Sequence, residues 1–140
     1  MTLESLIRPN ILRLKPYASA RHEFTGTGEV FLDANENPYE SGVNRYPDPL
    51  QQALKQRISA IKGIPAENIF LGNGSDEAID LLFRIFCEPG KDNVIIFPPT
   101  YGMYEVCAEI NNVAVKKVPL TTDYQLDLEA TEAAVDANTK

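Results

Sequence analysis

Hydrophobic positions along this chain follow two alternating patterns, one typical of helices and one typical of short buried strands. Between residues 49 and 62 they recur three or four positions apart, which predicts an amphipathic helix with Pro49 in its first turn and Gly63 at its end. A continuous apolar run at 93–97 is typical of a buried parallel strand, and a further strand is expected at 113–118. The other expected elements are strands at 30–32 and 69–71 and helices at 75–86, 101–112 and 126–135.

Strand and helix alternate four times after a first segment, residues 1–29, that proline and glycine punctuate. Such alternation predicts an α/β fold in three layers, with a parallel sheet covered by helices on both faces. The helix expected over 75–86 is apolar on most faces, so we expect it to be covered by the sheet and by another layer, such as a second subunit. The chain is therefore expected to consist of an N-terminal arm, 1–29, and one α/β domain, 30–140.

Composition narrows the classes of function. The 140 residues carry a net charge of −7, and 24% are charged and 44% hydrophobic, which is ordinary for a soluble domain. Without a Lys/Arg cluster, a nucleic-acid partner is not expected. Without a signal-peptide pattern or a membrane-spanning apolar run, we expect a cytoplasmic protein. Cys87 and Cys107 are expected to be small buried apolar residues, and a single histidine, His22, argues against a metal site.

The loop at residues 72–77 is a glycine turn that leads from an expected strand into the apolar helix. The first N–H groups of a helix lack partners and its dipole favours an anion, so Gly74, Ser75 and Asp76 could hold a phosphate. The alternative is an ordinary helix start with acidic residues in its first turn, which this loop alone favours. The charges of Asp76 and Glu77 oppose a phosphate unless their side chains point away.

A second loop, from Pro98 to Tyr104, has the same plan with an aromatic residue at the turn. Two prolines restrict its backbone, which would aim Tyr101 at a flat ligand. Packing on the core is an equal alternative for Tyr101 and the favoured one for Tyr104. Ligands of α/β sheets bind beyond the carboxyl ends of strands, where both loops would lie. Few ligands carry both a phosphate and an aromatic ring, and pyridoxal phosphate is one of them.

Three further candidates rest on weaker grounds. Tyr46, between Arg45 and a proline, could present its phenol to a ligand, or it could simply cover a helix entry. Asn35 lies in a polar loop that also reads as an ordinary Asx-rich turn, and Tyr17 is uninformative alone. No nucleophile–base pair, carboxylate pair or metal-ligand set accompanies them. The residues thus indicate an α/β domain with a planar, phosphate-bearing ligand, and leave the reaction open.

Six segments in register resemble the class I and II aminotransferases, whose fold is that of aspartate aminotransferase (pyridoxal-phosphate fold type I). They are Pro16-Tyr17, Leu32 to Pro38, Asn44 to Asp48, Gly72 to Glu77, Cys87 to Gly90 and Pro98 to Tyr104. The resemblance covers residues 14–140. It implies that the chain is the arm plus the first part of the large, cofactor-binding domain.

The resemblance also implies roles for the candidate residues. The N–H groups of Ser75 and Asp76, with the Ser75 hydroxyl, would bind the phosphate of pyridoxal 5′-phosphate, and Tyr101 would stack on its ring. Tyr46 would reach the cofactor phosphate of the neighbouring subunit in a homodimer. A small, phosphorylated, amino-acid-like substrate would lie near the remaining two candidates, Tyr17 and Asn35.

Family members carry their catalytic residues later than the segments that resemble this chain: the Schiff-base lysine, the acid beside the ring nitrogen and the substrate-binding arginines. Lys140 does not match that lysine, because it follows a polar, helix-like segment rather than a Ser-rich loop. We therefore expect the N-terminal part of a longer transaminase, inactive alone. The alternatives are another enzyme of this fold, such as an aromatic aminotransferase or a threonine-phosphate decarboxylase, or a non-catalytic α/β module that binds a phosphate ligand.

Overall fold

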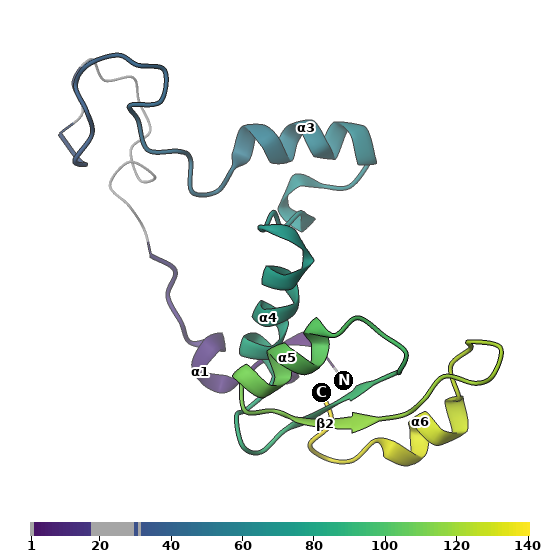
Figure 1. Ribbon diagram of the computed structural model, residues 1–140. Coiled ribbons are helices and arrows are strands. Elements are labelled where there is room, and N and C mark those ends of the chain that lie inside the picture. Colours follow the sequence, from purple (N-terminus) through teal and green to yellow (C-terminus); the bar gives the residue numbers. More distant parts are fainter. Residues whose placement is uncertain (1, 18–29, 31) are drawn as a thin grey trace. The chain divides into compact units, whose positions relative to one another are not determined.

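The computed structural model describes residues 2–17, 30 and 32–140 (Figure 1). It divides into two compact units. We call the first the sheet unit; it comprises the described residues up to Leu14 together with Gly72–Lys140. We call the second the loop unit; it comprises the described residues from Lys15 to Leu71. The predicted boundary after residue 29 stays a prediction, because residues 18–29 lie outside the described part.

The sheet unit is built on two parallel strands and the helices beside them (Figure 1). In chain order its elements are the 3-10 helix η1 (Leu3–Ser5), α1 (Pro9–Leu12), α4 (Gly74–Phe86), β1 (Asn93–Ile96), α5 (Met103–Ile110), β2 (Ala114–Lys117) and α6 (Leu128–Ala134). From α4 onward each element was predicted from its hydrophobic pattern, with ends that differ by at most three residues. β1 and β2 pair from Asn93 opposite Ala114 to Ile96 opposite Lys117, and α5 is the crossover between them.

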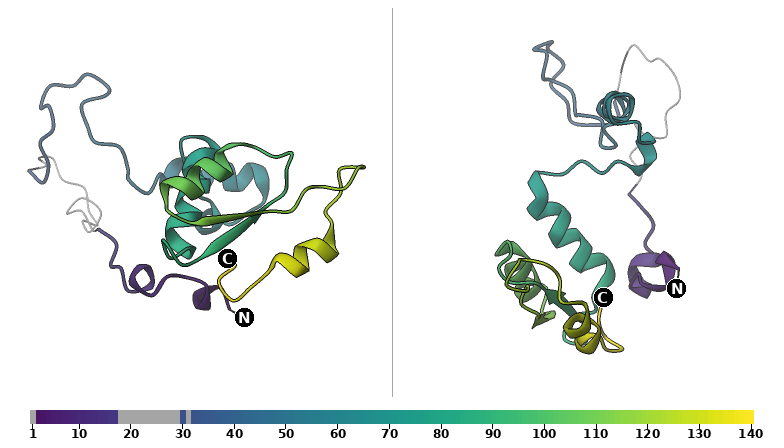
Figure 2. Two further views of the ribbon diagram at one scale, coloured as in Figure 1. Left: turned by 60° about the horizontal axis from the view of Figure 1, so that its bottom comes forward. Right: turned by 90° about the vertical axis from the view of Figure 1, so that its right-hand side faces the viewer.

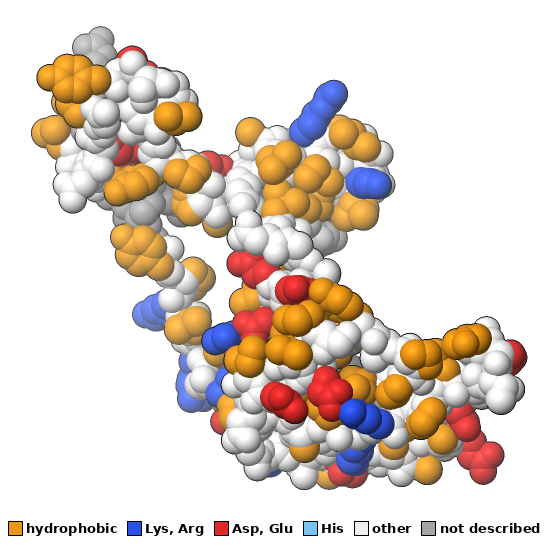
Figure 3. Space-filling view, in the orientation of Figure 1, with side chains coloured by type: hydrophobic (Ala, Val, Ile, Leu, Met, Phe, Trp, Pro, Cys, Tyr) orange, Lys and Arg blue, Asp and Glu red, His pale blue; other side chains and the backbone are white. Residues whose placement is uncertain are grey.

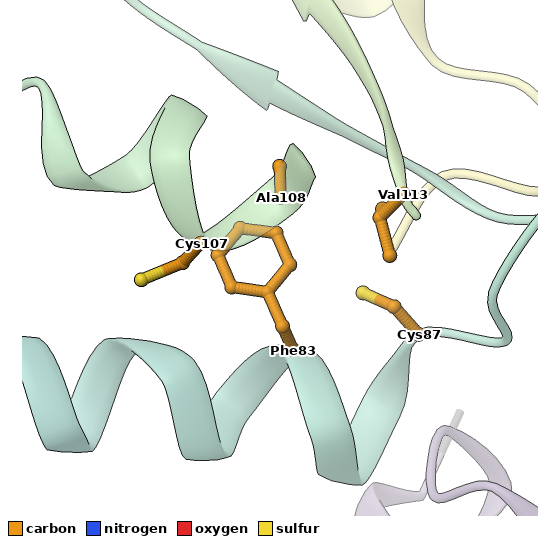
Figure 4. Packing of buried hydrophobic residues seen from close by; sticks show 5 residues of the cluster. All are labelled: Phe83, Cys87, Cys107, Ala108 and Val113. Atoms are coloured by element: carbon orange, nitrogen blue, oxygen red, sulfur yellow. The ribbon is translucent and has the colours of Figure 1, made fainter. Parts of the chain in front are cut away.

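The core of the sheet unit lies where α4 packs on α5 (Figure 4). Phe83 of α4 and Cys87, the residue after α4, face Cys107 and Ala108 of α5, and Val113 completes the cluster just before β2. Both cysteines are buried and free, as predicted. Burial raises the pKa of each thiol, which keeps it protonated and unreactive.

The N-terminal segment of the sheet unit is fixed to the C-terminal end of α4. The backbone N–H of Arg8 donates to the Ile85 carbonyl at 3.0 Å, and its guanidinium Nη1 donates to the Arg84 carbonyl at 3.0 Å. Its Nε also pairs with Glu88 Oε2 at 3.1 Å. Since the last carbonyls of a helix lack intrahelical donors, Arg8 supplies what the end of α4 needs.

The last residues of the sheet unit lie beside β1 on the edge opposite β2. Thr139 forms a parallel bridge with Asn93. The N–H of Asn93 donates to the Asn138 carbonyl at 2.9 Å, and the N–H of Lys140 donates to the Asn93 carbonyl at 3.0 Å. The described sheet is thus two strands with the beginning of a third parallel neighbour.

The loop unit contains α3 (Gln52–Lys62) and the 3-10 helix η2 (Ala66–Asn68). α3 ends at Gly63, whose φ of 67° is left-handed, as its sequence predicted. Its start was predicted three residues too early. The Asp48 carboxylate accepts from the N–H groups of Leu50 at 2.9 Å and Gln52 at 2.7 Å, so it forms a turn that contains Pro49.

Two predicted strands do not form. Val30 and Leu32 lie outside any strand and are 75% and 91% exposed, and Phe31 lies outside the described residues. Residues 69–71 are also irregular, with Phe70 58% exposed. An apolar run becomes a strand only beside a partner, and the described residues offer these two runs none.

Across the same described ranges, every helix is too short or too polar to cross a membrane.

Candidate functional site

The first turn of α4 has open donors at the position where the sequence predicted a phosphate site. Gly74 begins the helix with φ of 79°, and a Cβ placed there would meet no heavy atom within 4 Å. The preceding Asn73 makes no side-chain capping bond. The Glu77 carboxylate turns back to accept from the Asn73 N–H, which places its charge beside the start of the helix. The first N–H groups of this 13-residue helix lack intrahelical partners, and the helix dipole favours an anion there.

Asp76, the other acidic residue of this turn, lies near Tyr101. The pKa of the Tyr101 phenol is raised, first by hydrogen bonding to the Asp76 carboxylate, then by desolvation and by the charge of Asp76. The Oδ1 atom of Asp76 is buried and has no hydrogen-bond partner in the described part of the chain. Asp76 thus lies beside Tyr101.

Tyr101 lies two residues before α5 and keeps 53% of its surface exposed. Its ring stands edge-to-face with that of Tyr104, at a centroid distance of 6.3 Å and an interplanar angle of 87°. The prediction that Tyr104 belongs to the core was wrong, because it is 38% exposed on α5 and packs beside Tyr101 instead. The ring of Tyr101 therefore lies against that of Tyr104 while much of the residue remains accessible to a flat ligand.

A polar contact joins α4 to α5 one turn beyond Asp76. The Asp80 carboxylate accepts from Arg84 Nε at 2.6 Å and from Asn111 Nδ2 at 2.7 Å. These two hydrogen bonds hold the pKa of Asp80 below its ordinary value. Together with the core cluster, this contact fixes the helix that carries Ser75 against the helix that follows Tyr101.

The other three candidates lie in the loop unit. Tyr17 is 93% exposed, Tyr46 is 63% exposed and Asn35 is exposed. Their predicted roles toward a neighbouring subunit and a substrate stay predictions, as do the roles of Gly74, Ser75, Asp76 and Tyr101.

Sequence reasoning missed Glu36, which links two of these candidate loops. Its carboxylate accepts from the Tyr46 N–H at 2.9 Å and from Arg45 Nη1 at 2.9 Å, and only 4% of its side chain is exposed. Glu36 therefore fixes the loop of Asn35 to the loop of Tyr46. The only available signal was an acid between two asparagines with an arginine nine residues later, and no periodicity marks such a pair.

No group of His, Cys, Asp or Glu suited to a metal occurs among the residues described.

Comparison with known proteins identifies the family. The profile of the class I and II aminotransferases matches residues 25–140. The histidinol-phosphate aminotransferase of Bacteroides fragilis is 59% identical over 99% of this chain, and that of Cytophaga hutchinsonii is 58% identical over the same share. A solved structure described as a putative histidinol-phosphate aminotransferase from Erwinia carotovora atroseptica has a TM-score of 0.54 and 28% identity. It matches 69% of this chain and 28% of its own.

The chain belongs to the class I and II aminotransferase family. This confirms the predicted fold class, the N-terminal part of the aspartate aminotransferase fold. The tyrosine aminotransferase of Leishmania infantum, at a TM-score of 0.54 and 22% identity over 65% of this chain, has the same fold. The chain spans 41% of the length of the Bacteroides fragilis and Cytophaga hutchinsonii relatives.

Proposed function

We propose that this chain forms the arm and the cofactor-binding part of a pyridoxal-phosphate-dependent aminotransferase of histidine biosynthesis. The reaction would convert histidinol phosphate and 2-oxoglutarate to imidazole acetol phosphate and glutamate. The observation that carries this proposal is the 59% identity, over 99% of the chain, to the histidinol-phosphate aminotransferase of Bacteroides fragilis. The open first turn of α4 and the partly exposed ring of Tyr101 support it.

Bound pyridoxal phosphate would supply an electron sink for the bonds at the substrate's amino carbon. The N–H groups of Ser75 and Asp76 and the Ser75 hydroxyl would bind its phosphate, with the dipole of α4 favouring the negative charge. The ring of Tyr101 would lie on the pyridine ring, with Tyr104 edge-to-face beside it. These residues bind and orient, and none of them moves a proton at the substrate.

The remaining roles in the proposal belong to the loop unit and to the whole enzyme. Tyr46 would reach the cofactor phosphate of the neighbouring subunit in a cytoplasmic homodimer, and Tyr17 and Asn35 would lie near the substrate. We expect no transaminase activity from the 140 residues alone, because no residue in them matches the Schiff-base lysine of the family. Turnover above that of free pyridoxal phosphate would contradict this expectation.

The binding part of the proposal can be tested with pyridoxamine 5′-phosphate, which lacks the aldehyde that reacts with lysines. We expect it to bind to the chain, with a change in its ³¹P chemical shift, and we expect Ser75→Ala to weaken binding roughly tenfold, since bonds to charged groups contribute about 1.5–3 kcal/mol. Tyr101→Ala should also weaken binding. Tyr124→Ala is the matched control, because Tyr124 is 72% exposed elsewhere in the sheet unit.

Pyridoxamine without the phosphate is the matched ligand control, and we expect it to bind far more weakly. Equal binding of the two ligands would contradict a phosphate site at α4. So would an unchanged affinity in Ser75→Ala, or no binding of pyridoxamine 5′-phosphate at all.

A further inference from the structure

The peptide bond between Asn73 and Gly74 joins a reactive side chain to an unhindered backbone nitrogen. Asparagine is a chemically labile residue, because the backbone nitrogen of the next residue can attack its side-chain carbonyl carbon. A side chain on that next residue crowds the attack, and glycine has none. In the 140-residue sequence, Asn73 is the one asparagine that is followed by glycine. The sequence therefore singles out this bond for intramolecular attack.

The structure leaves both reacting groups open. Asn73 and Gly74 are exposed, and a Cβ placed on Gly74 would meet no heavy atom within 4 Å. Asn73 is the N-cap residue of α4, but its side chain makes no capping hydrogen bond. In the right-hand view of Figure 2, the start of α4 projects beyond β1, β2 and α6 of the sheet unit. Water and base therefore reach the bond between the two residues.

The side-chain contacts described for Asn73 restrain it only weakly. The Glu77 carboxylate accepts from the Asn73 N–H and, at 3.3 Å, from Asn73 Nδ2. Both contacts are exposed, so water competes for them. Gly74 has a φ of 79°, in a region that glycine enters freely, so the backbone there can rotate. The side chain of Asn73 can therefore turn toward the Gly74 nitrogen.

The place of this bond at the start of α4 favours the attack electrostatically. The attacking group is the deprotonated Gly74 nitrogen, which carries a negative charge. The N-terminal end of a helix stabilises negative charge, and α4 has 13 residues. The first N–H groups of a helix also lack intrahelical acceptors, so the Gly74 N–H is available to base.

We propose that Asn73 is a site of spontaneous deamidation, which replaces the neutral amide before α4 by a carboxylate and weakens phosphate binding at that helix start. The Gly74 nitrogen loses its proton to base and bonds to Asn73 Cγ, and the side-chain amide group leaves as ammonia. Water then opens the cyclic imide at one of its two carbonyls, which gives aspartate or isoaspartate. Water is the co-reactant consumed, and nothing is oxidised or reduced.

The effect on phosphate rests on the function proposed above, which assigns the cofactor phosphate to this turn. A carboxylate at the N-cap accepts from the N–H groups two or three residues later, which here belong to Ser75 and Asp76. Its charge joins those of Asp76 and Glu77, and acidic side chains already lie over this half of α4 in Figure 3. Isoaspartate also adds a methylene group to the main chain, which displaces the turn. Both products therefore oppose a bound phosphate.

The modification is tested by peptide mass spectrometry of the 140-residue chain during incubation at mildly alkaline pH. We expect Asn73 to gain the mass of an NH2-to-OH exchange at least roughly tenfold faster than Asn68, because Asn68 is followed by the β-branched Ile69. Asn68 is the matched control, since it is also exposed and lies in the same tryptic peptide. Asn73→Gln should abolish the fast reaction, because its longer side chain does not close the same ring.

The effect on binding is measured with pyridoxamine 5′-phosphate on the fresh chain, the incubated chain and Asn73→Asp. We expect the incubated chain and Asn73→Asp to bind roughly fivefold or more weakly than the fresh chain, because a like charge lies beside the phosphate. Asn73→Gln is the control and should lose no affinity during the same incubation. Circular dichroism checks that each protein is folded.

Equal rates of modification at Asn73 and Asn68 would overturn the proposed site. Unchanged affinity in both the incubated chain and Asn73→Asp, with Ser75→Ala still weakened, would overturn the effect on phosphate and leave the proposed function standing. Absence of binding by the fresh chain would contradict the proposed function and with it the effect on affinity, while the mass measurement would still decide the modification.

Discussion

Phe83 and Phe70 are phenylalanines of one chain with opposite surroundings. Phe83, on α4 of the sheet unit, is 7% exposed and lies in the core cluster, whereas Phe70 of the loop unit is 58% exposed. All the buried residues among those described belong to the sheet unit. Within the described ranges, therefore, only the sheet unit has a core, which forms where α4, α5 and the start of β2 meet.

In the loop unit, the polar contacts described above join residues close in the sequence. The Glu36 carboxylate accepts from Arg45 and from the Tyr46 N–H, and the Asp48 carboxylate accepts from the N–H of Gln52. Such contacts fix a loop but contribute little to global stability, because water competes for each of them. The sheet unit thus has a buried core, whereas the described contacts of the loop unit are local hydrogen bonds, and three variants test this difference.

The largest effect is expected from truncating the core. Phe83→Ala should lower the free energy of unfolding of the sheet unit by roughly 3 kcal/mol, because it removes a buried ring and leaves a cavity. Phe70→Ala is the matched control and should change it by about 0.5 kcal/mol or less, as for a surface position. Urea unfolding followed by circular dichroism measures both. Equal losses in the two variants would show that the loop unit also has a core.

A smaller, pH-dependent effect is expected at Asp136. Its hydrogen bonds with Lys116, Asn93, the Asn138 N–H and Thr139 hold its pKa below the ordinary 3.8. A carboxyl whose pKa is depressed by folding stabilises the fold above its unfolded-state pKa, and this contribution disappears as the pH falls from 3.8 through the folded value. The stability lost in Asp136→Asn should therefore be greatest near neutral pH and shrink as the pH falls below 3.8 towards 2.

Melting curves of Asp136→Asn and of the native chain between pH 2 and 7 measure this difference. Glu129→Gln, an exposed acid in the first turn of α6, is the control and should show no comparable pH dependence. A gap between Asp136→Asn and the native chain that stays constant over the whole range would contradict the prediction.

The smallest global effect is expected at Glu36. Glu36→Ala should speed hydrogen exchange at the Tyr46 amide, because that N–H loses its acceptor, while the urea midpoint of the sheet unit stays unchanged. Glu40→Ala is the matched control: Glu40 also pairs with Arg45, but at 3.8 Å and with 77% of its side chain exposed. A shifted midpoint in Glu36→Ala would show that the loop unit stabilises the sheet unit.

Sequence patterns predicted best the elements that depend on hydrophobic spacing alone or on a single glycine. The helix over 75–86, the strands at 93–97 and 113–118 and the end of α3 at Gly63 were all confirmed. The start of α3 was wrong, because the Asp48 side chain competes with the helix for the N–H groups of Leu50 and Gln52. Of the candidate site, the helix start at Gly74 could be read from the sequence, but the contact between Asp76 and Tyr101 could not.

The sequence by itself determined the α/β alternation, the two glycine-bearing loops and, through its similarity to relatives, the family. Local propensity and hydrophobic period are sufficient for these, since each depends on neighbours within about one helical turn or strand. Only the tertiary structure decided which apolar runs become strands, that Glu36 joins two loops and that Asp76 turns toward Tyr101. Each of these depends on a contact with a residue of another segment, and a local hydrophobic pattern does not specify such a contact.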